Sequence, residues 1–553
     1  MSVEKLIVDH METWTSALQT RSTAGRGSSG KIDLYGIKKL RELILELAVR
    51  GKLVPQDPND EPASDLLKRI AAEKAELVKQ GKIKKQKPLP EISEEEKPFE
   101  LPEGWEWVHL PDIYCSISES SRKIKSSEIL PEGKYPVIEQ SQEFISGYCN
   151  NECLLIKLNN PVIVFGDHTR NIKFIDFDFV VGADGVKILS PILICERFFF
   201  WQLRSFKLDV RGYARHFKVL NSCLFALPPI AEQERIVEKV SSLMSLCDQL
   251  EQQSLTSLDA HQQLVETLLG TLTDSQNTAE LAENWARISE HFDTLFTTEA
   301  SVDALKQTIL QLAVMGKLVP QDPNDEPASE LLKRIAQEKA QLVKEGKIKK
   351  QKPLPPISDE EKPFELPEGW EWCRIGNIVN IKSELVSPKD YLNLYQVAPD
   401  IIEKGTGRVI SKRTVKESGV KGPNSRFYKG QIVYSKIRPS LSKVFLAEYN
   451  GLCSADMYPL DCYINPNYLL KYILSIPFLI QVKKAENRIK MPKLNSDSFY
   501  NIIVAIPPYN EQQAIFDKIN SIEAVCNGLI SYIGIYHKTQ LHLADALTDA
   551  AIN

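Results

Sequence analysis

Clusters of Arg, Lys and His are the strongest candidates for chemistry in this 553-residue chain. They fall in two blocks that do not match each other, Val108–Phe225 and Cys373–Val504. Arg can bind a guanine edge through two hydrogen bonds and Lys can neutralise a phosphate, so such loops suit contact with the DNA major groove. One such cluster would equally fit an ordinary surface loop, but their presence in both blocks favours DNA binding. The candidate DNA-binding residues are His168, Arg170, Lys173, Arg211, Arg215 and Lys218 in the first block, and Arg426, Lys436, Arg438, Lys443, Arg488, Lys490 and Lys493 in the second.

Motifs for covalent chemistry are incomplete. The segment GRGSSGKI at Gly25–Ile32 matches the GxxxxGK part of a phosphate-binding loop, but Ile32 stands where Ser or Thr would meet magnesium. IPPY at Ile506–Tyr509 is similar to the catalytic tetrapeptide of amino-methyltransferases, yet the apolar Ile506 cannot accept a hydrogen bond from a target amine. The ten cysteines include no CxxC pair, which favours buried thiols over zinc or disulfides. We therefore expect no catalytic, cofactor or metal site in this chain.

The charge is divided unevenly along the chain. The formal net charge is −5, but Cys373–Ala505 contains 20 Lys and Arg against 10 Asp and Glu, and Val108–Ala226 contains 14 against 13. The rest of the chain is therefore acidic. Because Lys and Arg supply most non-specific affinity for DNA, a basic block on an acidic frame is typical of a nucleic-acid reader.

A near-identical repeat frames the two blocks. Leu45–Trp107 returns as Leu310–Trp372 with only eight changes in 63 positions, and Ala226–Val240 is echoed by Ala505–Ile519. A repeated frame that carries two different inserts suits a protein that recognises two different targets. Within the repeat we expect a helix that stops at Gly51 or Gly316, a Pro-rich connector, and a second helix capped by Ser64 or Ser329. The lysines of the following KIKK segment are interpreted as a solvated surface, with contact to DNA phosphates as the alternative.

Apolar seams predict a coiled coil. Ile236, Val240, Leu243, Cys247 and Leu250 follow alternating spacings of four and three, and Ile515, Ile519, Ile522, Cys526 and Leu529 repeat them. Two helices of about 40 residues should pack together, and at ~1.5 Å per residue each would span about 60 Å. Short β-type runs in the blocks, such as PVIVFGD and QIVYSKI, and a helical stretch at Asn467–Ala485 indicate α+β domains. The copies at the two ends of the chain indicate a pseudo-twofold, nearly circular arrangement.

These features together resemble the specificity subunit of type I restriction-modification systems. Each variable block begins after LPEGWEW, at Leu101–Trp107 and Leu366–Trp372, and ends at an (L/I)PPxxEQ junction, at Leu227–Gln233 and Ile506–Gln512. The resemblance implies target recognition domains at 99–229 and 364–508. It also implies helical regions at 1–98 and 230–363, each with a linker, and a C-terminal helix at 509–553. The two long helices would form an antiparallel coiled coil. Only some branches of this family have a segment like 1–98.

The resemblance also implies partners. The chain would bind a split double-stranded DNA site and dock two modification subunits, which use adenosylmethionine to methylate adenine, and two restriction subunits, which use ATP and magnesium. No apolar run is long enough for a membrane span, so a cytoplasmic location is expected. Two alternatives remain open. One is a stand-alone DNA methyltransferase or nuclease, and the other is a coiled-coil scaffold with two protein-binding domains.

Overall fold

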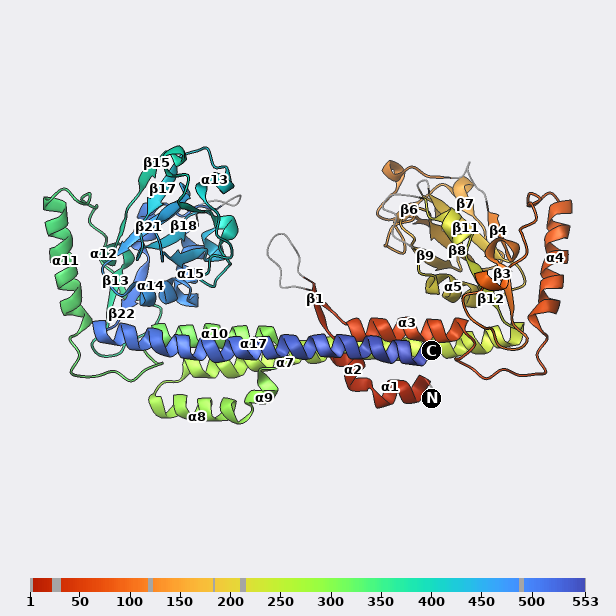
Figure 1. Cartoon of the computed structure of the whole chain (residues 1–553), viewed down its shortest axis with the longest axis horizontal. Coiled ribbons are helices and arrows are strands. Elements are labelled where there is room, and N and C mark those ends of the chain that lie inside the picture. The colour runs from red at the N-terminus through yellow and green to blue at the C-terminus, as the bar shows by residue number, and fades with distance from the viewer. Residues whose placement is uncertain are drawn as a thin grey trace. The chain divides into compact units, whose positions relative to one another are not determined.

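The computed structural model describes residues 3–21, 31–117, 123–182, 185–208, 215–486 and 492–552. The chain divides into two compact units: unit 1 contains Met1–Ser257 and Tyr536–Asn553, and unit 2 contains Leu258–Ile535. Each unit carries an α+β domain on a frame of helices (Figure 1). Residues 22–30 lie outside the described residues, between strands β1 (Gln19–Arg21) and β2 (Lys31–Asp33), and they include Gly25–Gly30 of the GRGSSGKI segment.

Two long helices confirm the predicted coiled coil. Helix α7 (Ile230–Asp274) has 45 residues and α17 (Tyr509–Ile552) has 44. In unit 1, Cys247 of α7 is buried in one apolar cluster with Ala544 of α17. In unit 2, Val265 of α7 is buried with Cys526 of α17. The beginning of each helix thus packs near the end of the other, and the pair is antiparallel.

A third helix completes the packing in each unit. Helix α3 (Tyr35–Val49) buries Leu40, Leu43 and Ile44 in the cluster that holds the Ile236–Leu250 seam. Helix α10 (Glu299–Val314) does the same in unit 2, where Leu305 and Ile309 share a cluster with Cys526. The Ile236–Leu250 seam therefore lies in one cluster with α3, whereas the second seam is divided: Ile515 and Ile519 are buried with the second domain, and Cys526 is buried with α10 and α7. The remaining helices of the frame are α1 (Val3–Asp9), α2 (Met11–Ser16), α8 (Thr278–Glu290) and α9 (Phe292–Leu295).

The repeated segment folds alike in both units. Gly51 and Gly316 follow α3 and α10 with φ of 65° and 73°, which confirms the predicted helix stops. The second helices are α4 (Ala63–Lys79) and α11 (Ala328–Lys344). The prediction that Ser64 and Ser329 cap them was wrong, since the N-cap residues are Pro62 and Pro327. A side-chain cap is not needed there, because the Ala63 and Ala328 amides donate to the carbonyls of Gly104 and Gly369.

The two domains have the same strand arrangement in their first sheet, but in their second sheet the fourth strand lies at opposite edges, with β6 beside β5 in unit 1 and β15 beside β17 in unit 2. Each contains two four-stranded sheets, with one parallel strand pair in the second sheet, β5–β10 in unit 1 and β16–β20 in unit 2. The first sheets have the order β4-β11-β8-β9 and β14-β21-β18-β19. The second sheets have the order β6-β5-β10-β7 and β15-β17-β20-β16. The mixed helices and sheets confirm the predicted α+β class.

The strands of the first domain are β4 (Tyr114–Ile117), β5 (Tyr135–Ile138), β6 (Gly147–Cys149), β7 (Leu155–Ile156), β8 (Val162–Gly166), β9 (Ile172–Ile175), β10 (Phe179–Val181) and β11 (Val186–Pro191), with helices α5 (Glu196–Ser205) and α6 (Phe217–Leu220). Those of the second domain are β14 (Val379–Ile381), β15 (Glu384–Val386), β16 (Tyr395–Val397), β17 (Asn424–Phe427), β18 (Ile432–Ser435), β19 (Val444–Leu446), β20 (Gly451–Ser454) and β21 (Met457–Cys462), with α12 (Ile375–Ile378), α13 (Val415–Ser418), α14 (Pro466–Ile473), α15 (Ile476–Ala485) and α16 (Ser496–Asn501). The helix expected over Asn467–Ala485 is broken into α14 and α15 because Pro477 opens a new helix.

The ends of each variable block lie side by side. Strand β3 (Glu106–His109) pairs with β12 (Leu224–Leu227), and Val108 is opposite Phe225. Strand β13 (Glu371–Arg374) pairs with β22 (Ile503–Ile506), and Cys373 is opposite Val504. Each block therefore begins and ends at its own two-stranded sheet, next to the long helices.

The PPxxEQ junction fastens this sheet to the repeated segment. Glu232 accepts hydrogen bonds from Trp105 Nε1 at 2.9 Å and from Gln56 Nε2 at 3.0 Å. Glu511 accepts the equivalent bonds from Trp370 at 2.9 Å and Gln321 at 3.1 Å. Burial raises the pKa of Glu232 and of Glu511. Each glutamate thus joins the Pro-rich connector, the LPEGWEW segment and a long helix.

Replacing Glu232 by Ala should therefore destabilise unit 1. The change leaves the buried Trp105 indole N–H without an acceptor and removes one partner of the Gln56 amide, which keeps its bond to the Gly51 carbonyl, so it costs about 1–3 kcal/mol in the free energy of unfolding. Glu232→Gln keeps one acceptor oxygen and should cost about half as much. Urea denaturation followed by tryptophan fluorescence measures both. Glu234→Ala, an exposed glutamate on the same helix, is the control. Equal stability of Glu232→Ala and this control would contradict the proposed fastening.

Two further expectations concern the whole chain. All ten cysteines carry free thiols, of which five are buried, four are partly buried and Cys153 is exposed, so the prediction of buried thiols holds for half of them. Among the described residues, no helix is long and apolar enough to cross a membrane.

Candidate nucleic-acid interface

Two equivalent loops carry candidate residues from both blocks. In unit 1 the loop joins β8 to β9 and contains Arg170, whose φ is 62°. In unit 2 the loop joins β18 to β19 and contains Arg438, whose φ is 45°. Positive φ is uncommon for residues other than glycine, and such strain often marks functional sites. The two unlike domains thus place an arginine in the same rare backbone conformation on the same loop.

A second segment supports each loop. In unit 1 the His216 amide donates to the Asp167 carbonyl at 2.8 Å, and the Phe217 amide donates to Asp167 Oδ1 at 2.8 Å. In unit 2 the Leu494 amide donates to the Lys436 carbonyl at 2.8 Å, and the Arg438 amide donates to the Pro492 carbonyl at 2.9 Å. The fold therefore brings together candidates that are distant in sequence.

The first of these surfaces consists of His168, Arg170, Arg215 and Lys218. Arg215 and Lys218 are exposed, and His168 is half-buried. The Arg170 guanidinium donates to the Leu208 carbonyl at 2.8 Å, which fixes its direction.

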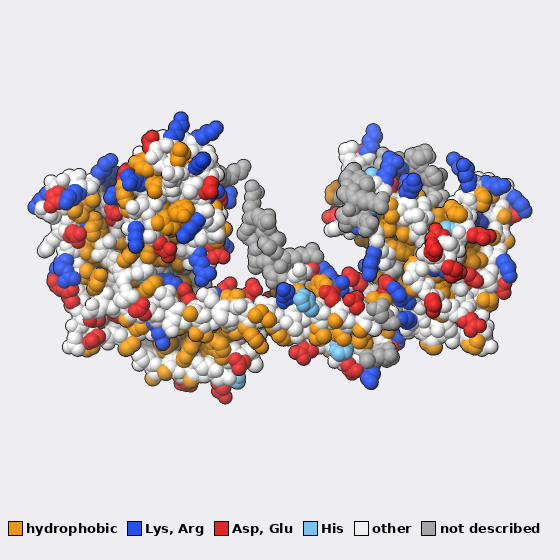
Figure 2. Space-filling view, in the orientation of Figure 1, with side chains coloured by type: hydrophobic (Ala, Val, Ile, Leu, Met, Phe, Trp, Pro, Cys, Tyr) orange, Lys and Arg blue, Asp and Glu red, His pale blue; other side chains and the backbone are white. Residues whose placement is uncertain are grey.

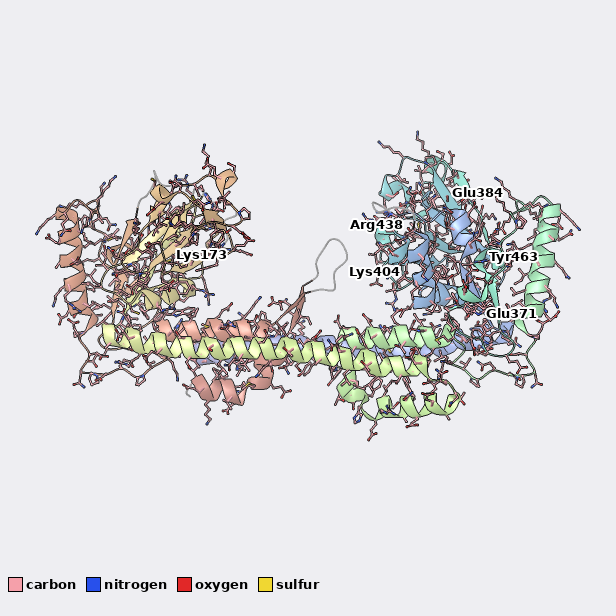
Figure 3. All side chains as sticks on the ribbon, turned by 180° about the vertical axis from the view of Figure 1, so that it is seen from behind. Lys173, Glu371, Glu384, Lys404, Arg438 and Tyr463 are labelled. Carbon is pink, nitrogen blue, oxygen red and sulfur yellow. The ribbon has the colours of Figure 1, made fainter. Side chains whose placement is uncertain are left out.

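Lys173 has a structural role. Its side chain is buried, and its ammonium donates to the carbonyls of Glu139, Glu143 and Phe144 at 2.8, 2.5 and 3.4 Å (Figure 3). Burial lowers the pKa of this lysine. Since all three donors of an ammonium group are engaged, we leave Lys173 out of the candidate interface.

The second surface consists of Lys436, Arg438, Lys443 and Lys493. Arg438 is exposed at the edge of the domain (Figure 3). Lys436 donates to the Ala455 carbonyl at 2.7 Å, and Lys493 lies 3.2 Å from Asp456 Oδ1. Lys443 donates to the Pro399 carbonyl. Arg438 is therefore the most available of the four, which fits the prediction that it reads a base.

Arg426 belongs to a different part of the second domain. It lies on β17, in the other sheet, with its guanidinium 5.2 Å from the Tyr391 ring and 4.9 Å from the Tyr428 ring. Glu384 is 3.8 Å from it and accepts a hydrogen bond from Tyr428. The Nε atom of Arg426 is buried, and no partner for it is found within the described ranges. Tyr428 is two residues from Arg426 in the sequence, whereas Tyr391 is distant in the chain and is brought to Arg426 only by the fold.

Three candidates, Arg211, Arg488 and Lys490, lie outside the described residues. The segments that contain them, 209–214 and 487–491, adjoin the two surfaces in sequence. Lys and Arg side chains are also spread over the visible face of the second domain (Figure 2), as the charge count predicted.

Comparisons with known proteins point to one family. A family model described as "Type I restriction modification DNA specificity domain" matches residues 102–260 and 367–533. The specificity subunits of the type I restriction enzymes EcoAI and EcoEI of Escherichia coli are 51% and 49% identical to the chain, and each match covers 100% of both proteins. A crystal structure of the HsdS subunit from Thermoanaerobacter tengcongensis is 16% identical, with a TM-score of 0.36 over 83% of this chain and 98% of that one.

Proposed function

This chain belongs to the type I restriction-modification DNA specificity family, and we propose that its two domains read the two halves of a split DNA site. It is a specificity subunit with two target recognition domains and is not itself catalytic. We place the first recognition domain at 99–229 and the second at 364–508. Residues 1–98, 230–363 and 509–553 are the helical frame.

One observation carries the proposal: Arg170 and Arg438 lie in loops that join equivalent strands, each has a positive φ, and the side chains around them differ. The two loops differ in length, 167–171 and 436–443, but each presents an arginine between the same pair of strands of the first sheet. The neighbours differ, with His168 and Lys218 in one domain and Lys436 and Lys493 in the other. Different side chains on one scaffold suit recognition of different bases by domains that approach DNA in the same way.

We further propose that the frame docks two modification subunits and two restriction subunits, which supply the chemistry with adenosylmethionine, ATP and magnesium. Exposed apolar side chains on α17 support a docking role, since Val525, Tyr532 and Ile535 are 64%, 68% and 64% exposed. Apolar side chains gathered on one surface mark protein interfaces. The same proposal includes a cytoplasmic location for the complex.

Arg438 and Lys436 should affect DNA binding in different ways. Arg438→Ala is expected to cost ~1 to 3 kcal/mol on the specific site and to relax one base position, because a base contact carries sequence information. Lys436→Ala should weaken binding to all sequences and reduce the salt slope by roughly one. Titrations of specific and random duplexes at several salt concentrations separate the two effects.

The control is Arg287→Ala, which removes an exposed arginine from α8 and should change neither affinity. Equal losses on specific and random duplexes for Arg438→Ala would contradict its role in base reading.

A further inference from the structure

The segment after α4 and after α11 is a lysine turn that is identical in the two units. Lys82–Lys87 and Lys347–Lys352 both read KIKKQK, although the recognition domains beside them differ. An element that is the same in both halves cannot distinguish two half-sites. On DNA it can contact what the two halves of a site have in common, which is the phosphate backbone.

The lysines of the turn are exposed, and most of them form no ion pair among the described residues. All eight of them are exposed. Lys347 pairs with Glu345 at 2.8 Å, and Lys352 lies 3.6 Å from Asp497. The other six, Lys82, Lys84, Lys85, Lys87, Lys349 and Lys350, have no ion pair among the described residues. Figure 2 shows Lys and Arg side chains gathered at the ends of α4 and α11 that are far from the long helices.

The turn is held in place, unlike a simple solvated run. Gly81 and Gly346 end the helices with φ of 69° and 70°. The glutamine of each turn accepts a hydrogen bond from a lysine of the preceding helix, Gln86 from Lys74 at 3.0 Å and Gln351 from Lys339 at 3.2 Å.

The lysines on the helices also reach the recognition domains. Lys74 donates to the Pro111 carbonyl at 2.5 Å, and Lys339 donates to the Gly376 carbonyl at 2.6 Å. Each glutamine is thus tied through a helix lysine to the recognition domain, with Gln351 partly buried and Gln86 exposed, while the lysines around it are exposed. Charges that are positioned before binding lose less entropy when they meet a ligand.

The position of the turn in unit 2 separates it from the Arg438 loop. The Lys339 ammonium lies 5.5 Å from the Tyr463 ring, and Figure 3 shows Tyr463 and Arg438 on opposite sides of the domain. The connector before α11 contacts the start of α17, where Asn510 donates to Asp325 at 2.8 Å. The turn thus lies at the end of unit 2 where α17 begins. Helix α17 leaves unit 2 at the opposite end of that unit.

We propose that the two lysine turns bind the phosphates of duplex DNA flanking each half-site, as a second contact that does not depend on sequence. This inference rests on the proposed function, because it requires that the domains bind a split site. The turns add affinity and leave the choice of sequence to the recognition domains.

The test compares two duplexes that carry the target mapped in the host. One duplex ends at the outer edge of each half-site, and the other continues for two helical turns, about 20 base pairs, on both sides. The full chain is used together with its modification subunits. Lys82→Ala/Lys84→Ala/Lys85→Ala should lower affinity for the long duplex roughly 10-fold and reduce its salt slope by about 2 to 3, since each neutralised phosphate contributes about 0.9. Affinity for the short duplex should change less than about 2-fold, because its flanking phosphates are missing.

The matched control is Lys68→Ala/Lys79→Ala/Lys97→Ala, which removes three lysines that pair with Asp65, Glu76 and Glu94. This control should leave both affinities unchanged. The equivalent triple change at Lys347, Lys349 and Lys350 should repeat the loss, and combining the two triples should multiply it.

Equal losses on both duplexes, or no loss on the long one, would overturn the proposal. Unchanged DNA affinity with loss of a partner subunit on purification would also overturn it and assign the turns to protein contact. If the unaltered complex did not prefer its mapped target to a scrambled duplex, the proposed function itself would fail.

Discussion

Exchanging Cys373–Val504 for the corresponding block of a related specificity subunit is expected to change one half of the DNA target completely and leave the other half unchanged. The reason is geometric. Cys373 and Val504 are direct partners in the β13–β22 pair, so the exchanged block enters and leaves the frame at one place. Both joints keep the LPEGWEW segment and the PPxxEQ junction, including the contacts of Glu511 with Trp370 and Gln321.

The exchange of Val108–Phe225 is the matched experiment in unit 1, where the two end residues are also paired. It should change the other half-site. Adenine methylation mapped across the genome gives both results. A change in both half-sites after either exchange would contradict the modular interpretation.

The second large effect concerns catalysis. The purified chain should transfer no methyl groups from adenosylmethionine, whereas the chain mixed with its modification subunit should methylate adenine in the target. The IPPY segment has a structural explanation: Ile506 is fully buried in β22, and the Pro507 carbonyl accepts a hydrogen bond from Gln512. The segment therefore forms a junction between a strand and a helix.

Transfer of labelled methyl groups to DNA measures this difference. The modification subunit alone is the control, and it should not methylate the target without this chain. Methyl transfer by the pure chain would support the alternative of a stand-alone methyltransferase. A complex that lacks salt-dependent DNA binding would support the alternative of a protein-binding scaffold.

The helical frame could be predicted from the sequence because the segment Leu45–Trp107 is repeated at Leu310–Trp372. The helix stops at Gly51 and Gly316 and the long helices followed from local patterns. The cap at Ser64 was predicted wrongly, because the Gly104 carbonyl, distant in sequence, takes the place of a side-chain cap. The hydrogen bonds that Glu232 accepts from Trp105 and Gln56 could not be predicted either, because only the fold brings these residues together.

The candidate interface was less predictable, because a basic residue in a loop has no local signature for its direction. Lys173 is only three residues after Arg170, yet it points into the domain and binds three carbonyls. The equivalence of Arg170 and Arg438 became visible only through their backbone angles. The assignment of individual residues to bases or phosphates stays a prediction.

Mapping methylated adenines by single-molecule sequencing, in cells that express this chain with its modification subunits, tests the central claim most directly. The account predicts one motif in two specific parts, separated by a constant number of unspecified base pairs, with a methylated adenine in each part and no such methylation when the chain is removed. A continuous motif, or methylation that persists without the chain, would contradict it.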